Sequence, residues 1–179
     1  MREIRSKVLV MAVALLFAVT MATPTVATVL AKEKVDAVLT NTSAGPFVPG
    51  RTWTTNGGIQ QQKYNTRTYY AILTIGTDSY PVVMPSTISA TLNTETGYFV
   101  GIYYGAYYIP EEGSDSGFTG ITIARMYDFD PSGSTFPPFS RVVIHCTLQG
   151  FGDFEGQTLK LSTDGDFFAY FTWTGYCVK

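Results

Sequence analysis

The chain offers few side chains capable of acid–base, nucleophilic or metal chemistry. Its 179 residues include one histidine, His145, and two cysteines, Cys146 and Cys177. A zinc site or a histidine-based triad needs more of these side chains, and no Ser–His–Asp arrangement is recognisable from the spacing. The sequence therefore predicts no catalytic residue, no metal site and no cofactor. A general acid or base role for His145 is the alternative to an exposed position on a strand.

Arg125 is the candidate for ligand binding. It shares strand parity with Tyr127 and two isoleucines, so it faces the interior of a β-barrel if they do. A buried arginine needs a partner, which Glu155 or Asp153 at a barrel corner would supply. With Tyr103 and Tyr127, Arg125 would suit a small anionic, apolar or amphipathic ligand. Barrels of this size are also filled by their own side chains, and that alternative stays open.

One acidic loop begins like a calcium-binding loop. Residues 128–134 read Asp-Phe-Asp-Pro-Ser-Gly-Ser, but the twelfth position is Phe139 instead of a bidentate glutamate, and Pro131 stiffens the middle. A second acidic loop, residues 111–115, could converge with it. We expect both loops to be solvated, with a weak calcium site as the alternative.

The composition predicts strands. There are 12 Tyr, 12 Phe and 2 Trp, and aromatic and threonine-rich segments are typical of β-structure. No segment after Lys32 shows a convincing apolar stripe of helical period. The low charge is unlike that of a disordered chain, and a net charge of −2 gives no electrostatic reason to bind nucleic acid.

The first 31 residues have the pattern of a secretory signal peptide. Arg2, Arg5 and Lys7 precede an uncharged apolar run at 8–22, and the segment 29–31, ending in alanine, offers a cleavage site, with 25–27 as a second possibility. We therefore expect a secreted, extracellular protein whose mature domain is 32–179. The alternative is a retained membrane anchor, because the run extends uncharged to residue 30.

Residues 32–179 read as a series of strands and turns. The strands are expected at 34–40, 52–55, 59–75 as one long or bulged strand, 80–92, 98–109, 118–127 and 139–149, followed by two more around 159–162 and 171–177. Asn93 to Gly97 is a hairpin loop, and Asp164-Gly165 has the signature of a tight turn. This order predicts a single antiparallel meander β-barrel of about eight strands, closed by pairing its first and last strands. A β-sandwich is the alternative.

Segment 98–109 is aromatic on both faces. Tyr103 and Tyr107 share one face, whereas Tyr98, Tyr104 and Tyr108 share the other. The outer row predicts a contact surface, and hence self-association through this strand.

The two cysteines fall on the apolar faces of their strands. Val142, Ile144, Cys146 and Leu148 share one parity, and Cys177 shares a parity with Trp173. In a secreted chain this pattern predicts a disulfide between Cys146 and Cys177. The alternative is two buried thiols that pack as small apolar groups.

Two segments carry a resemblance to known proteins. Residues 148–159, Leu-Gln-Gly-Phe-Gly-Asp-Phe-Glu-Gly-Gln-Thr-Leu, with Trp-Thr-Gly-Tyr at 173–176 and Arg-Thr-Trp-Thr-Thr-Asn-Gly-Gly at 51–58, resemble uncharacterised secreted proteins of archaea and some bacteria. The glycine-rich hairpin is also similar to the late hairpin of small β-barrels of the allene-oxide-cyclase and dirigent type. The resemblance implies an antiparallel barrel and no particular activity. Independently of it, the glycines permit a sharp corner at which Phe154 closes one barrel end.

Three functions follow as hypotheses. The first is a secreted or cell-surface barrel without catalytic activity that acts in binding or extracellular assembly. The second is an isomerase- or cyclase-like enzyme that positions a small apolar substrate in the barrel lumen. The third is a filament subunit whose N-terminal strand, 34–40, pairs with the open edge of a neighbour.

Overall fold

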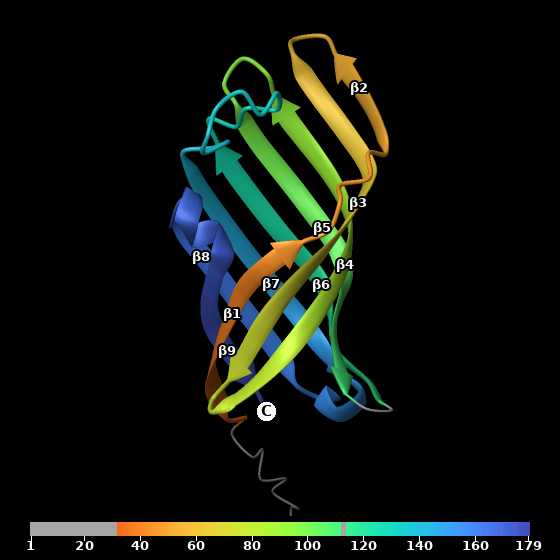
Figure 1. The fold of residues 1–179 in the computed structure, drawn as a ribbon, viewed down its shortest axis with the longest axis vertical. Coiled ribbons are helices and arrows are strands. Elements are labelled where there is room, and N and C mark those ends of the chain that lie inside the picture. Colours follow the sequence, from red (N-terminus) through yellow and green to blue (C-terminus); the bar gives the residue numbers. More distant parts are fainter. Residues whose placement is uncertain (1–31, 112–113) are drawn as a thin grey trace, which may run out of the picture. The chain divides into compact units, whose positions relative to one another are not determined.

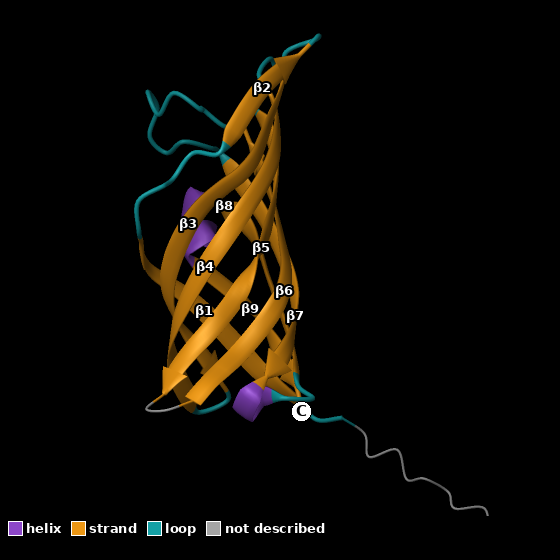
Figure 2. Cartoon of the chain, turned by 90° about the vertical axis from the view of Figure 1, so that its right-hand side faces the viewer, coloured by secondary structure: helices purple, strands orange, loops and turns teal. Residues whose placement is uncertain are grey.

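The computed structural model describes residues 32–111 and 114–179, and residues 32–179 form one structural unit. The expected signal peptide, 1–31, lies outside the described residues. The described chain is nearly all strand, as expected (Figure 2). Its nine strands are β1 (Lys34–Ala44), β2 (Arg51–Thr55), β3 (Ile59–Ile75), β4 (Asp78–Asn93), β5 (Tyr98–Glu111), β6 (Ser114–Tyr127), β7 (Arg141–Phe151), β8 (Thr158–Asp166) and β9 (Thr172–Val178). Two short 3₁₀ helices, η1 (Gly152–Phe154) and η2 (Phe167–Phe171), follow β7 and β8.

Eight of the strands close into an antiparallel barrel. Each strand from β3 to β8 pairs with the next in sequence, and β1 fills the remaining place between β9 and β3 (Figure 1). Leu39 of β1 lies opposite Trp173 on one side and Leu73 on the other. The predicted barrel, with its first and last strands paired, is therefore confirmed, and the sandwich alternative is wrong. β1 is the strand that the filament hypothesis needs to be free, and it is paired on both sides within its own barrel.

The long strand β3 belongs partly to the barrel and partly to a projecting hairpin. Its second half pairs with β1, whereas its first half pairs with β2, for example at Trp53 and Gln61. The pairing register with β4 shifts between Gln62 and Asn65, and Tyr64 between them has a φ of 61°. Of the two alternatives for this segment, the bulged strand is therefore present, and the bulge redirects the strand where the hairpin leaves the barrel.

Alternation of side chains along the strands builds the core. On β7, Val142, Ile144, Cys146 and Leu148 are all buried, as their parity predicted. Each is followed by a residue that is less buried, because successive side chains of a strand point to opposite faces. The inner face of the barrel is thus apolar, and burial of that face drives its closure.

One end of the barrel is closed by an aromatic side chain. This closed end carries η1, and Phe154 of η1 is buried against Tyr80 and Phe118, with ring centroids 5.4 Å and 5.0 Å apart. A β-carbon on Gly150 would lie 1.9 Å from the Phe154 carbonyl oxygen, so only glycine permits this corner. Phe154 therefore closes a barrel end, as expected. The opposite, open end carries the loops 45–50 and 128–140 together with η2.

The predicted turn at Asp164 and Gly165 is wrong. Both residues continue β8, where Gly165 pairs with Val142 and Asp164 forms a salt bridge with Arg141 of β7. The chain turns afterwards, in η2. A β-carbon on Gly165 would lie 2.9 Å from that of Ala169, so this glycine allows η2 to fold close against the strand.

Candidate functional site

The lumen contains an open cavity at the end opposite Phe154. It has a volume of about 560 Å³. Its apolar lining comes from the end of β1 and the loop after it, with Ala44, Phe47 and Pro49, and from three further strands, the loop after β6 and η2. The larger side chains from these three strands, the loop after β6 and η2 are Ile88, Phe99, Met126, Phe129, Phe139, Phe167 and Phe171. The aromatic rings pack against one another, with centroids 5.0 Å apart for Phe99 and Phe129 and 5.2 Å apart for Phe139 and Phe167. A predominantly apolar cleft of this size is typical of a small-molecule site.

Arg67 is the only charged residue among the described residues that line this cavity. It shares the inward parity of β3 with Tyr69, and its guanidinium lies 5.6 Å from the centre of the Tyr69 ring. Its Nε donates a hydrogen bond to the Gly45 carbonyl oxygen, 3.0 Å away. Asn65, one inward position earlier, is buried and accepts a hydrogen bond from the Gly50 amide over 2.7 Å. These two contacts tie the 45–50 loop to the cavity wall.

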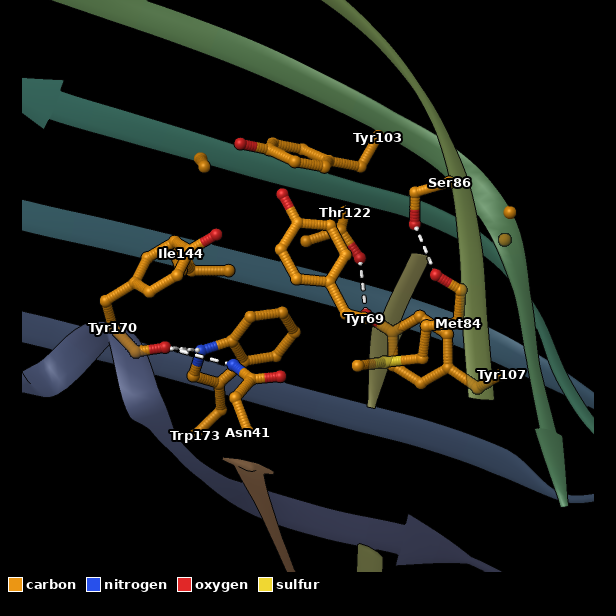
Figure 3. Close-up of a pocket in the computed structure, with 13 residues that line it drawn as sticks. Asn41, Tyr69, Met84, Ser86, Tyr103, Tyr107, Thr122, Ile144, Tyr170 and Trp173 are labelled. Carbon is orange, nitrogen blue, oxygen red and sulfur yellow. Dashed lines mark hydrogen bonds between the residues drawn. The ribbon is translucent and has the colours of Figure 1, made fainter. Parts of the chain in front are cut away.

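Three tyrosines form a neck at the inner limit of the cavity. Tyr69, Tyr103 and Tyr170 come from β3, β5 and η2, and their hydroxyl groups point toward one another (Figure 3). Burial raises the pKa of Tyr103 and of Tyr170 well above the usual value, and the Tyr69 hydroxyl raises both further. The nearby positive charge of Arg67 opposes the rise. Both phenols are therefore protonated at neutral pH and can donate hydrogen bonds.

A smaller chamber of about 30 Å³ lies beyond the neck. Its polar groups include Tyr107 and Thr122, whose hydroxyl oxygens are 2.9 Å apart. Asn41 lines both the chamber and the cavity, and its amide donates to the Tyr170 carbonyl oxygen over 3.1 Å. Its Oδ1 is the one buried side-chain polar atom of the described residues that lacks a hydrogen-bond partner. A space of this size admits about one or two water molecules, so the chamber is too small for a bulky apolar group.

Cys146 lies close to Tyr107 and Thr122 in the barrel interior. Burial raises the pKa of the Cys146 thiol to about 11, although hydrogen bonds from Leu161, Thr122 and Tyr107 oppose the rise. Burial also raises the pKa of Tyr107 well above the usual value. A thiol with such a pKa is protonated at neutral pH and is a poor nucleophile, so Cys146 is a packing residue.

The expected binding residues divide between the two faces of the barrel. Tyr103 points into the lumen, as predicted, and lines the neck. Arg125 does not: the buried residues of β6 are the alternate ones, Thr122, Ala124 and Met126, while Ile121, on the parity of Arg125, is 46% exposed. The inward orientation expected for Arg125 is therefore wrong. Apolar character did not separate the two faces of this strand, because Ile121 lies on the outer surface while the polar Thr122 faces the lumen.

Tyr127 and Glu155 also lie away from the lumen. Tyr127 is on the outer parity of β6, where its ring packs against Tyr98, with centroids 5.4 Å apart, and beneath the Arg141 guanidinium. Glu155 is exposed and follows η1 at the closed end. Arg125 lies near the opposite end of the barrel, so Glu155 cannot be its partner. Tyr98, Tyr104 and Tyr108 are exposed on β5, as their parity indicated, and self-association through them stays a prediction.

The sequence analysis missed Arg67, Tyr69, Tyr170 and Asn41. A signal for the first two was present, because Arg67 and Tyr69 share the parity of the apolar residues at 71, 73 and 75. No comparable local signal existed for Tyr170, since its place at the neck depends on how η2 folds back.

The predicted disulfide is wrong: Cys146 and Cys177 are both free and buried. Both side chains face the interior, as expected, but β8 lies between their strands. Cys146 pairs with Leu161 of β8, whereas Cys177 pairs with Leu159. Neighbouring strands are about 4.8 Å apart, so two strand spacings and an offset of two residues exceed the Cα separation that a disulfide spans. The Cys177 thiol donates instead to Gln157 Oε1, 3.3 Å away.

The two acidic loops do not converge. Asp115 lies at the start of β6 and Asp128 follows its end, so they belong to opposite ends of the barrel. The carboxylate of Asp130 accepts hydrogen bonds from the Thr135 amide and from the hydroxyls of Ser132 and Ser134. These bonds lower the pKa of Asp130 well below its usual value. Asp130 therefore organises the loop that carries Pro131, Pro138 and Phe139 to the cavity rim.

His145 lies on the exposed parity of β7, outside the lumen. Within the described part of the chain, no group of three His, Cys, Asp or Glu side chains is placed to hold a metal ion. Across those same residues, no helix has the length and apolar character needed to span a membrane.

Compared with known proteins, the chain matches no family model, no curated protein and no solved structure. The resemblances drawn from residues 51–58 and 148–159 therefore stay predictions.

Proposed function

We propose that this protein is a secreted or cell-surface binding protein that holds a small, largely apolar molecule in the open half of its barrel. The observation that carries the proposal is the cavity of about 560 Å³, lined mainly by aromatic and aliphatic side chains. Transfer of an apolar molecule from water into such a lining is favourable. A few polar groups, Arg67 and the neck tyrosines, would fix its orientation.

The lining supports binding over catalysis. Among its described residues there is no carboxylate and no histidine, which are the usual general acids and bases. Burial raises the pKa of Tyr103 and of Tyr170, so at neutral pH these two neck tyrosines donate hydrogen bonds and do not remove protons. An isomerase or cyclase acting by shape alone is the second hypothesis, and nothing in the lining favours it.

Two phenylalanines of η2 provide a matched test. Phe171 lines the cavity and is 39% exposed, whereas Phe168 does not line it and is 73% exposed. The neutral fluorophore 1-aminoanthracene, which emits more strongly in apolar surroundings, serves as the probe. We expect saturable binding at one site, weakened about fivefold by F171S because apolar contact area is lost, and changed less than twofold by F168S.

Two results would contradict the proposal. The first is an emission that rises linearly with the probe and never saturates. The second is an equal effect of F171S and F168S, which would place the probe on the outer surface. Near-ultraviolet circular dichroism of both variants checks that the barrel remains folded.

A further inference from the structure

Arg67 brings an uncompensated positive charge to the cavity wall. Within the described residues the one salt bridge joins Arg141 to Asp164 on the outer surface, so no carboxylate there neutralises Arg67. Its Nε donates a hydrogen bond to the Gly45 carbonyl oxygen, and its guanidinium carbon lies over the Tyr69 ring. Partial burial of an unpaired cation costs free energy, and an anion bound beside it would recover part of that cost.

The neck places neutral donors near this cation. The hydroxyls of Tyr69, Tyr103 and Tyr170 converge at the inner limit of the cavity (Figure 3). Arg67 is close enough to influence the ionisation of Tyr103 and Tyr170, so cation and phenols act on one region. An arginine with several phenolic O–H donors is suited to a carboxylate, because hydrogen bonds to an ionised acceptor are shorter and stronger than neutral ones.

We propose that the ligand is an apolar monocarboxylate whose carboxylate lies between Arg67 and the three neck phenols. Its apolar body extends outward among Phe99, Phe129 and Phe167, because the chamber beyond the neck holds only about 30 Å³. This inference rests on the proposed function and adds the chemistry and the direction of the ligand. It excludes a cationic head group, which Arg67 would repel.

Three probes with the same ten-carbon chain separate the head group from the tail: decanoate, decan-1-ol and decyltrimethylammonium. Each is measured by displacement of 1-aminoanthracene from the intact barrel. We expect decanoate to bind about tenfold more tightly than decan-1-ol, since it adds charge-assisted hydrogen bonds, and the cation to bind most weakly. Raising the salt concentration should reduce the difference in affinity between decanoate and decan-1-ol, because salt screens the attraction between the carboxylate and Arg67.

Substitutions at two arginines test whether the preference for decanoate arises at Arg67. R67M should remove the preference for decanoate, so that the ratio of the affinities for decanoate and decan-1-ol falls to about one, and R67K should keep part of the preference because it keeps the charge. R51M is the control: Arg51 is exposed on β2, stacks on Trp53 and does not line the cavity. If R67M does not fold, Y103F decides, and it should weaken decanoate several-fold more than decan-1-ol.

The outcomes separate the two proposals. Equal affinities for decanoate and decan-1-ol, or a preference that survives both R67M and Y103F, would overturn the carboxylate assignment and leave the apolar binding function intact. Failure of every probe, including 1-aminoanthracene, to bind would overturn the proposed function and the assignment with it. A preference for decanoate that is lost in R67M and kept in R51M supports both.

Discussion

Arg67 and Arg125 show how the two faces of a strand decide what a side chain can do. The chemistry expected of Arg125, a cation beside tyrosine hydroxyls and apolar walls, is present in the lumen, but Arg67 supplies it. Both arginines alternate with apolar residues, so parity alone leaves two orientations for each strand. Burial resolves them: Arg67 shares a face with the buried Ala71 and Leu73, whereas Arg125 shares one with the exposed Ile121.

The buried thiol of Cys146 predicts a loss of stability in alkali. Its pKa is raised from 9.0 to about 11 in the folded state, so above pH 9 the unfolded chain releases the thiol proton first. The stability that depends on a protonated Cys146 thiol is fully present below pH 9 and is lost as the pH rises toward 11. Two pKa units correspond to about 2–3 kcal/mol. We expect the free energy of unfolding, measured with urea between pH 9 and 11, to fall less steeply in C146A than in the parent.

C177A is the control for this slope. Burial raises the pKa of Cys177, but Lys179 lowers it, so C177A should change the slope less than C146A. Buried Tyr103 and Tyr170 have raised pKa values as well, and their part of the loss begins near pH 10 and is kept in both variants. Identical slopes for C146A and the parent would show that the Cys146 thiol titrates at its ordinary pKa in the folded state.

At the scale of strands and turns, local patterns predicted most of what is local. The alternation of apolar and polar residues correctly predicted which side chains between Val142 and Leu148 face the interior. The bulge in β3 and the hairpin loop at 93–97 were also recognised, because each is specified by a few neighbouring residues. The disulfide failed because it depends on how many strands separate two cysteines. The Asp164-Gly165 turn failed because the same dipeptide also allows close packing of η2. The site itself depends on loops folding over the barrel mouth, which no short segment specifies.

Close approach of strands at the interior glycines predicts a sharp intolerance in β9. Gly175 pairs with Ala37 on one side and Leu161 on the other, and a β-carbon there would lie 2.0 Å from the Lys160 carbonyl oxygen. Because backbone on both sides is held by the closed barrel, G175A should lower the free energy of unfolding by about 3 kcal/mol or more. Urea denaturation at pH 7 measures this loss.

Gly45 offers a matched alanine substitution. A β-carbon on Gly45 would make only ordinary contacts, the nearest 3.5 Å from the Thr68 carbonyl oxygen. G45A should therefore change the free energy of unfolding by no more than about 0.5 kcal/mol. If G175A lowered the free energy of unfolding no more than G45A, the close approach of the β8 backbone to Gly175 would be wrong.

At the scale of the whole barrel, the lumen has a packed half and an open half. The closed end is filled by residues such as Leu148, Leu159 and Phe118, none of which is accessible to solvent. The open end is lined by partly exposed rings on a loop and on η2. The sequence left open whether the lumen is filled or hollow, and in the structure it is filled near one end and hollow near the other. Stability and binding should accordingly depend on different residues.

This division predicts a separation of effects between two large-to-small substitutions. Leu148 is 0% exposed in the packed half, so L148A should cost about 2–5 kcal/mol of stability while leaving the affinity for 1-aminoanthracene within twofold. Phe129 lines the cavity and is partly buried, so F129A should cost less stability but weaken the probe several-fold. Urea denaturation and fluorescence titration of the same samples measure both effects. A loss of affinity in L148A that matched the loss in F129A would mean that the two halves respond as one, because a cavity near the closed end then changes the shape of the mouth.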